Sequence, residues 1–311
     1  MDTSFTHIFQ FAISTTLPIF LVLFVGMFLS SRGKVSDTFI RDANQIIYSI
    51  GLPLMLFITC ATSTIALDKN TGIIYAFAVM TLAVFFGAWQ TTKWLNCEKD
   101  LGVIVQGCFR GNLVILGLAF ASSAYGNKGL ALATLPVAFT VVIYNILSVY
   151  ILDRDRGVKA TLKNIATNPL IIAIICGWIY NASQLPMPNI ATTTAHYITQ
   201  MVLPLALICI GASLNVKQLA HFDRAVVSAN IWKLLISPVL ACLLGYALNL
   251  RGDALMVLFL LASSPTATVS FVMAQALGAN SKLAAAIVAQ TTFFSLFTVT
   301  AGLILLAKIA Y

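Results

Sequence analysis

The sequence predicts an all-α membrane protein with ten transmembrane helices, which form two inverted repeats of five helices each. Three observations predict this fold class: the composition, the spacing of the charged residues and an internal repeat. Of the 311 residues, 59% are hydrophobic and only 9% are charged. A soluble domain of this length cannot bury so much apolar surface, so the composition indicates an integral membrane protein.

The charged residues fall in short clusters, and the gaps between them are long enough to cross a bilayer. A crossing helix needs about 20 apolar residues. The gaps that hold one crossing each are 3–31, 43–67, 70–92, 129–152, 254–281 and 283–307. The gap 164–216 holds two crossings, because the polar and proline-rich stretch 181–189 divides it. Two further spans contain one charge each: 101–125 with Arg110, and 225–249 with Lys233.

The distribution of Lys and Arg predicts the orientation of these helices. Twelve of these residues follow the first, third, fifth, seventh and ninth helices, whereas four lie on the opposite face. Cytoplasmic loops carry the excess of Lys and Arg in membrane proteins. We therefore expect a multi-pass protein of the inner cell membrane with both termini on the extracytoplasmic side. The first helix has no basic n-region and no small-residue cleavage site, so we expect it to be retained.

The composition also limits the partners and cofactors. The net charge of +8 is largely a topology signal, and no basic domain stands clear of the lipid bilayer to bind nucleic acid. The six cysteines show no CxxC spacing. We therefore expect no metal site, no disulfide scaffold and no cofactor.

An internal repeat divides the chain into two halves. The pattern of "TLPIFLVLFVGMF" returns in "TNPLIIAIICGWI" with the offsets 169 − 18 = 151 and 177 − 26 = 151. The "LPL" around Pro53 returns around Pro204 at the same offset, 204 − 53 = 151, which marks both prolines as hinge or scaffold positions. We expect a first repeat at 1–152, a cytoplasmic linker at 153–163 and a second repeat at 164–311. Because five is an odd number, the second repeat enters the membrane upside down, as in secondary transporters.

Two of the expected helices are interrupted at matching places. The fourth contains "FRGNLVI" and the ninth contains "LASSPTATVSF". At an offset of 152, Asn112 corresponds to Ser264, and both are favourable N-cap residues. Pro265 is favoured at the first helical position. Each segment therefore predicts a first half-helix, a break and a newly capped second half-helix.

Both breaks are expected near the middle of the bilayer. Arg110 lies ten residues from Asp100 and Pro265 lies twelve from Asp253, which is roughly 15 and 18 Å at 1.5 Å per residue. The two helices enter from opposite faces, so the breaks can meet. Two half-helix N-termini would then present free amides and partial positive charge to an anion. The alternative is that the two sequences only kink their helices.

The ionisable residues also favour an anion. Arg110 and Lys233 lie well inside helices, whereas all ten acidic residues lie in loops or at helix ends. Such cations are functional candidates, although they can also snorkel or bind carbonyls that a break leaves free. His196, near the start of the seventh helix, is a candidate for proton coupling or an interfacial histidine. Three glutamines either line the pathway or pack between helices: Gln106, Gln275 and Gln290.

Long stretches of the chain resemble one family. They are "NPLIIAIICGWIYNASQLPMPNI", "MVLPLALICIGASL" and "SSPTATVSFVMAQALGANSKLAAAIVAQTT". Together they closely resemble the auxin efflux carrier family, whose bacterial members include proteins assigned as malonate transporters. The resemblance covers essentially the whole chain, and the "GN" at 111–112 matches the asparagine of the family's fourth helix.

The resemblance implies the ten-helix fold shared with bile-acid symporters and sodium/proton antiporters, in which helices 4 and 9 cross. Helices 1, 2, 6 and 7 would form a scaffold, often dimeric, and helices 3–5 and 8–10 a transport domain that moves as an elevator. The chain departs from plant members, because helix 4 has no proline at its break and Ser263 and Ser264 replace an asparagine in helix 9. The long cytoplasmic loop of many plant members is also absent. These departures count against auxin as the natural substrate and leave carboxylate transport.

Together with the resemblance, the sequence predicts a secondary carrier of small organic anions such as carboxylates similar to auxin or malonate, and the resemblance implies a homodimer. The candidate substrate-binding residues are Arg110, Gly111, Asn112, Lys233, Ser263, Ser264, Pro265 and Thr266. Because no buried carboxylate is available to carry a proton or a sodium ion, we expect uniport. One alternative is a sodium-coupled symporter of the bile-acid type, since break carbonyls can ligate sodium; another is a membrane sensor or structural protein. We expect no enzyme, because the sequence contains no HExxH, GxSxG or buried pair of acids.

Overall fold

The computed structural model describes residues 3–62, 67–152, 167–214, 216–220 and 222–310, and the expected linker 153–163 lies outside them. Within the described residues the chain is helical apart from short connections, and its extended pairing is one isolated bridge. This confirms the all-α class. Seven segments of the described chain are long and apolar enough to cross a membrane: Thr6–Ser31, Asp37–Ala61, Thr71–Trp94, Leu113–Leu152, Asn189–Ser213, Arg224–Ala247 and Ser281–Leu306.

The helices follow one another with short connections. The first half contains α1 (Thr3–Ser31), α2 (Asp37–Ile46), α3 (Leu52–Ala61), α4 (Leu67–Trp94), α5 (Leu101–Phe109) and α6 (Leu118–Leu152). The second half contains α8 (Pro169–Ala182), α9 (Asn189–Ser213), α10 (Val216–Leu219), α11 (Arg224–Ile231), α12 (Ser237–Ala247), α13 (Gly252–Ala262), α14 (Thr268–Ala276) and α15 (Ser281–Ala310). Short turns of other helix types are η1 (Ile47–Gly51), η2 (Glu98–Asp100), η3 (Leu113–Gly117) and η4 (Trp232–Ile236).

Polar residues at the ends of loops start several of these helices. The Ser36 hydroxyl, the Asn168 amide oxygen and the Asp223 carboxylate each accept a hydrogen bond from a first-turn amide, at 3.1, 2.9 and 2.7 Å. These bonds satisfy amides that have no partner inside their own helix. Within the long helices the backbone groups satisfy one another, which the hydrocarbon core of a membrane requires.

Gly126 divides α6 into two segments that fold back on each other. Its φ of 56° and ψ of −137° interrupt the helical conformation, and a positive φ is accessible to glycine at little cost. A Cβ placed on Gly129 would overlap the carbonyl oxygen of Ala121, eight residues earlier. In a straight helix these residues would lie about 12 Å apart, so the chain reverses its direction at Gly126.

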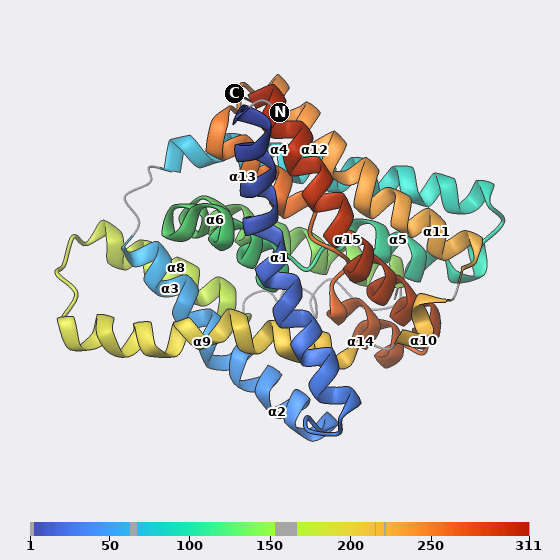
Figure 1. Cartoon of the computed structure of the whole chain (residues 1–311), viewed down its shortest axis with the longest axis horizontal. Helices are drawn as coiled ribbons and strands as arrows, with labels where there is room; N and C mark the ends of the chain where they lie inside the picture. The colour runs from blue at the N-terminus through green and yellow to red at the C-terminus, as the bar shows by residue number, and fades with distance from the viewer. Residues whose placement is uncertain (1–2, 63–66, 153–166, 215, 221, 311) are drawn as a thin grey trace.

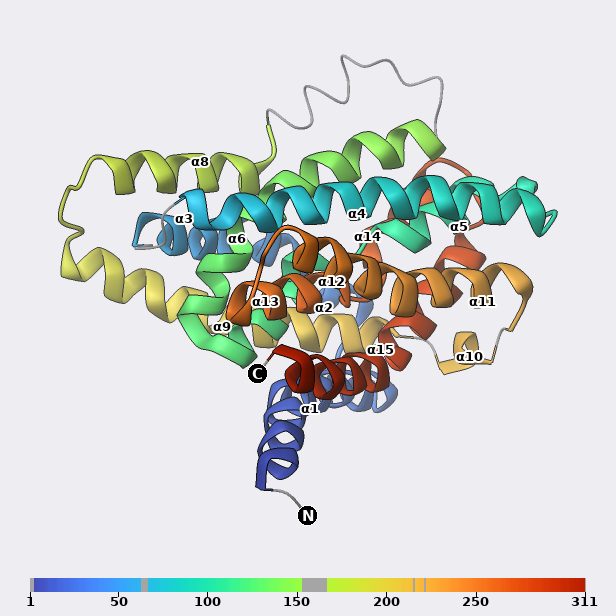
Figure 2. The ribbon, with the colours of Figure 1, turned by 90° about the horizontal axis from the view of Figure 1, so that it is seen from above.

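The helices pack in layers around two short, interrupted segments. In Figures 1 and 2, α1 and α15 lie on one face of the molecule and α4 and α8 on the opposite face. The views also place α3 and α8 toward one end of the long axis, and α10 and α11 toward the other. Between the faces lie α5 and α13, whose side chains from Val103 to Phe109 and from Leu255 to Ala262 are all buried. The interrupted segments therefore form the core.

The outside of the molecule is apolar. Five large apolar side chains on five different helices are each more than half exposed: Leu21, Phe86, Ile179, Leu243 and Leu305. Many further large apolar side chains are exposed on the described helices, and soluble proteins rarely expose so much apolar surface. It suits contact with lipid, so the exposed surface agrees with the membrane protein that the composition predicts.

The closest helix contact lies between α1 and α9, and each helix contributes a glycine. A Cβ on Gly211 would overlap the carbonyl oxygen of Leu23, and a Cβ on Gly26 would overlap that of Ile208. Small residues permit this close approach of membrane helices. Because the obstacles are backbone atoms, no side-chain rotation can make room for a methyl group.

We expect Gly211→Ala to lower the melting temperature of the purified protein by several degrees, because overpacking costs about 1–3 kcal/mol. The matched control is Gly72→Ala, whose Cβ would meet the end of the flexible Leu250 side chain. Scanning fluorimetry in detergent measures both variants. Equal melting temperatures for the two variants would contradict the close backbone contact.

Candidate functional site

The breaks in the two interrupted segments meet in the core. The first break, Arg110–Asn112, follows α5, and the second, Ser263–Ala267, follows α13. Gly111 and Thr266 form an antiparallel bridge. The Asn112 amide donates to the carbonyl of Pro265 at 2.7 Å, and the Ala267 amide donates to the carbonyl of Arg110 at 2.9 Å. Backbone groups that interrupted helices leave without partners are thus satisfied by the other break.

The predicted caps are wrong in their details. Asn112 occupies the N-cap position of η3, but its side chain caps no amide. Ser264 and Pro265 do not start the second half-helix, because α14 begins at Thr268 with Ala267 as its N-cap. The physical reason is the bridge, which keeps this stretch extended and supplies backbone partners where a local cap was expected.

Hydroxyl groups stabilise the second break. The Ser264 hydroxyl donates to the carbonyl of Leu261 at 2.7 Å. The Thr266 hydroxyl donates to the carbonyl of Gly107 on α5, also at 2.7 Å, and so ties the two segments together. Of the candidate residues in this break, Ser263, Ser264, Pro265 and Thr266 all lie at the crossover, but none lines the cavities described below.

Asn112 carries a buried donor that has no acceptor within the described chain. The side chain is 5% exposed, and its Nδ2 has no hydrogen-bond partner there. A buried polar group without a partner costs about 1–3 kcal/mol. The residue lines a cavity of about 320 Å³, which we call the crossover cavity. The lining of this cavity also contains Tyr48, Arg110, Tyr144, Asn145 and Asn168.

Arg110 is bound to the second segment of α6. Its guanidinium donates to the carbonyl of Tyr144 at 3.0 Å, to the Ser148 hydroxyl at 2.8 Å and to Oδ1 of Asn145 at 3.0 Å. The side chain is only 8% exposed. Arg110 therefore braces the first break against α6, and it also lines the crossover cavity beside Asn112.

Lys233 lies behind the bridge. It belongs to the π-helical turn η4, it is fully buried, and its Nζ donates to the carbonyl of Ala262, the last residue of α13, at 3.2 Å. A Cβ on Gly111 would lie 2.9 Å from this Nζ and 2.7 Å from the Ser264 hydroxyl. Lys233 lines none of the cavities described here. Its contacts hold the end of α13 against the first break.

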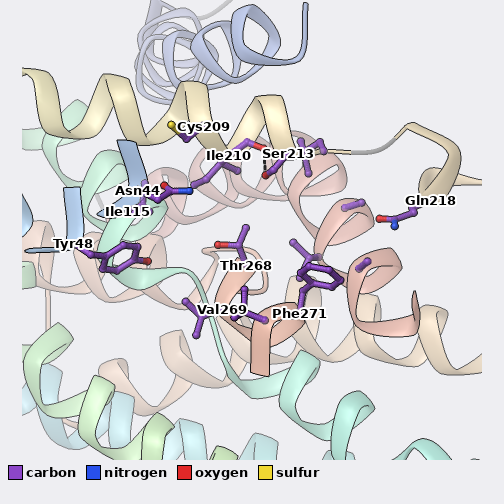
Figure 3. Close-up of a pocket in the computed structure, with 15 residues that line it drawn as sticks. Asn44, Tyr48, Ile115, Cys209, Ile210, Ser213, Gln218, Thr268, Val269 and Phe271 are labelled. Carbon is purple, nitrogen blue, oxygen red and sulfur yellow. Dashed lines mark hydrogen bonds between the residues drawn. The ribbon is translucent and has the colours of Figure 1, made fainter. Parts of the chain in front are cut away.

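A second cavity of about 500 Å³ adjoins the crossover cavity, and we call it the inner cavity. Figure 3 shows Asn44 and Tyr48 on one side of it, Ser213 above, and Thr268 and Phe271 from α14. Tyr48 and Val269 line both cavities. The two cavities therefore meet at these residues, next to the crossover.

The other predicted residues lie away from the crossover. His196, near the start of α9, lines two further cavities together with Met55 and Asn127. Pro53 lies in the first turn of α3, and Pro204 lies inside α9. The glutamines line none of these cavities: Gln106 bonds Met273, Gln290 is paired with Asn230, and Gln275 is exposed.

Sequence reasoning missed several residues of the crossover cavity, and also Ser148, which lies outside the cavity lining and binds Arg110. Tyr144, Asn145 and Ser148 lie in the charge-free gap 129–152, where three polar residues within two turns were an available signal. Tyr48 and Asn168 gave no such signal, because they reach the cavity only through the packing of η1 and α8.

Comparisons with known proteins match the chain to a transporter family and to several transporters. The model of the family described as "Membrane transport protein" matches residues 157–302. An uncharacterized transporter of Methanothermobacter thermautotrophicus is 24% identical over 86% of this chain and 89% of its own length. One of Methanocaldococcus jannaschii is 25% identical over 91% and 95%. A Rhizobium meliloti protein named "Putative malonate transporter" is 25% identical over 94% of each chain.

Residues 157–302 thus match this family of membrane transport proteins, and relatives that cover most of the chain are named as transporters. The resemblance that the sequence motifs carry is thereby confirmed. The family and these relatives are membrane transporters, which agrees with the transporter class that the sequence predicts.

We expect Arg110→Lys to destabilise the transporter, because one ammonium cannot reach three acceptors that a planar guanidinium reaches together. Losing hydrogen bonds from a charged group costs about 1.5–3 kcal/mol each, so the melting temperature should fall by several degrees. Arg224→Lys, at the exposed start of α11, is the control and should change little. An Arg110→Lys variant as stable as this control would refute the bracing role.

We expect Gly111→Ala to loosen the bridge, because the added methyl group displaces the Lys233 ammonium and the Ser264 hydroxyl. Hydrogen exchange at the segments containing Asn112 and Ala267 should then accelerate about tenfold or more, since overpacking costs about 1–3 kcal/mol. In the control Gly117→Ala, the methyl group meets only the end of the Leu261 side chain, at 3.1 Å. Unchanged exchange in the Gly111 variant would show that the bridge tolerates the methyl group.

Proposed function

We propose that the chain is a secondary transporter of small organic anions, namely carboxylates, and that it binds them at the crossover. The observation that carries this proposal is the buried Nδ2 of Asn112, which has no partner in the described chain. It lies where the two breaks pair and lines a cavity next to Arg110. A carboxylate oxygen would supply the missing acceptor, and hydrogen bonds to a charged group are among the stronger ones.

The charge of the crossover cavity supports an anion over a cation. Its lining contains Arg110 and, within the described chain, neither Asp nor Glu. Its volume of about 320 Å³ suits a small ligand. The Rhizobium meliloti relative is named for malonate, a small dicarboxylate. A carboxylate of this size is therefore the substrate class that we propose.

The position of the cavities supports an elevator movement. In the proposed division, α1, α2, α3, α8 and α9 form the scaffold, and the transport domain contains the other long helices. The crossover cavity lies between η1 and α8 on the scaffold side and the first break and α6 on the other. The inner cavity lies between α2 and α9 and the helices α14 and α15. Both cavities thus follow the boundary along which the two parts would slide.

The proposal includes the arrangement expected from the sequence. We propose two inverted repeats of five helices, 1–152 and 164–311, in a homodimer of the inner membrane with both termini extracytoplasmic. The antiparallel direction of the bridge between the two breaks supports the inversion. Figure 1 places the start of α1 and the end of α15 at the same edge of the molecule, which supports termini on one side.

We expect Asn112→Ala to reduce the flux of radiolabelled malonate into proteoliposomes, because it removes the buried donor. Since a hydrogen bond to a charged group contributes about 1.5–3 kcal/mol, flux at sub-saturating malonate should fall about tenfold or more. Asn112→Asp should reduce it further, because a carboxylate of similar shape repels the substrate. Asn189→Ala, at the exposed start of α9, is the control.

The same assay tests the coupling and the site. Uniport predicts that flux persists when choline replaces sodium, whereas a sodium-coupled symporter would stop. Full malonate flux in the Asn112→Ala variant would show that the crossover is not the binding site. Absence of flux in the wild-type protein, for malonate and for a panel of other small carboxylates, would overturn the proposed function.

A further inference from the structure

Two adjoining cavities of about 400 Å³ each lie at the other end of α9 from the inner cavity. Their linings share five residues, so we treat them as one space and call it the far cavity: Met55, Asn127, Leu130, His196 and Thr199. Thr199 and Ser213 of the inner cavity are 14 residues apart on α9, which is about 21 Å of helix. In Figures 1 and 2, α3 and the start of α9 lie toward one end of the long axis, and α10 lies toward the other.

The far cavity and the inner cavity approach each other along the same two elements. On α9 the lining passes from Leu207 in the far cavity to Cys209 in the inner cavity. On η3 and α6 it passes from Ala119 in the far cavity to Ile115 in the inner cavity. The barrier is about half a helical turn thick on α9, where the linings lie two residues apart, and about one turn on η3 and α6, where they lie four apart. The far cavity also lies between α1, α3 and α9 on one side and α6 on the other, which is the boundary that the two other cavities follow.

The lining of the far cavity provides donors and no carboxylate. Asn127 follows the turn at Gly126 and is exposed, and His196 on the facing helix is also exposed. The His196 ring bonds the side chain of Gln200 at 2.8 Å, which orients it. Lys128 lies at the edge of the cavity and is bonded to Asp253. Among the described residues that line the cavity there is neither Asp nor Glu.

We infer that the far cavity is a second carboxylate-binding site, on the extracytoplasmic side, in which His196 and Asn127 donate to the anion. This inference rests on the proposed function for its ligand class. The site receives or releases the anion on the side of the barrier away from the inner cavity. It gives a role to the polar side chains that α6 and α9 contribute to the lining of this cavity.

Thiol modification tests this site directly. Thr199→Cys places a thiol that lines the far cavity, one turn from His196, in the protein held in lipid nanodiscs, where both faces meet water. We expect the water-soluble reagent sulfonatoethyl methanethiosulfonate to modify this thiol above the background of the six native cysteines. Malonate at about ten times its dissociation constant should slow the reaction roughly tenfold. The uncharged analogue malonamide should leave the rate unchanged.

Further variants of Thr199→Cys decide whether the named residues bind the anion. Adding His196→Ala or Asn127→Ala should abolish protection by malonate, whereas adding His7→Ala, an exposed histidine on α1, should preserve it. Adding Asn112→Ala should also preserve it, which shows that protection does not come from the crossover. An unreactive thiol, equal protection by malonamide, or protection that survives His196→Ala would overturn the far site.

The outcomes separate this inference from the proposed function. If malonate flux depends on Asn112 but malonate does not protect the thiol at position 199, the far site is contradicted and the proposed function stands. If protection depends on His196 but no carboxylate is transported, the far site is supported as an anion site and the proposed transport is contradicted.

Discussion

The structure depends on one constraint, which is that backbone amides and carbonyls need partners where no water is available. Two helices are interrupted in the core, and each interruption removes hydrogen bonds within its helix. The bridge between Gly111 and Thr266 satisfies these groups in pairs, with hydrogen bonds of 2.7 and 2.9 Å. The two breaks therefore satisfy backbone groups of each other. Their contact also determines where Asn112 and the cavities beside it lie.

The two buried cations follow from the same constraint. Arg110 binds a carbonyl and two side chains of α6, and Lys233 binds the carbonyl that ends α13. Both contacts hold a broken segment against a continuous neighbour. Burying a cation is costly unless polar partners surround it, so these residues stabilise the breaks as well as raising the potential near Asn112. Of the two roles that the sequence left open for Arg110, the contacts show the bracing role, and its role toward an anion remains our proposal.

The cavities take their positions from the boundary between the helices that surround the breaks. The crossover cavity, the inner cavity and the far cavity all have α1, α2, α3, α8, α9 or η1 on one side, and α6, α14, α15 or the breaks on the other. Side chains pack less completely along such a boundary than within either group of helices. The close contact of α1 with α9 at Gly211 shows the tighter packing within one group.

By itself, the sequence determined the all-α membrane class, the places of both breaks and the two buried cations, because these depend on local composition and on spacing along one helix. It did not determine how the breaks are satisfied. Local rules assigned caps to Asn112 and Ser264, whereas the tertiary structure pairs Gly111 with Thr266, 155 residues later (266 − 111 = 155). Only the packing of η1, α6 and α8 brings Tyr48, Asn145 and Asn168 to one cavity. Such partners come from distant segments, and their meeting depends on side-chain packing that no local pattern encodes.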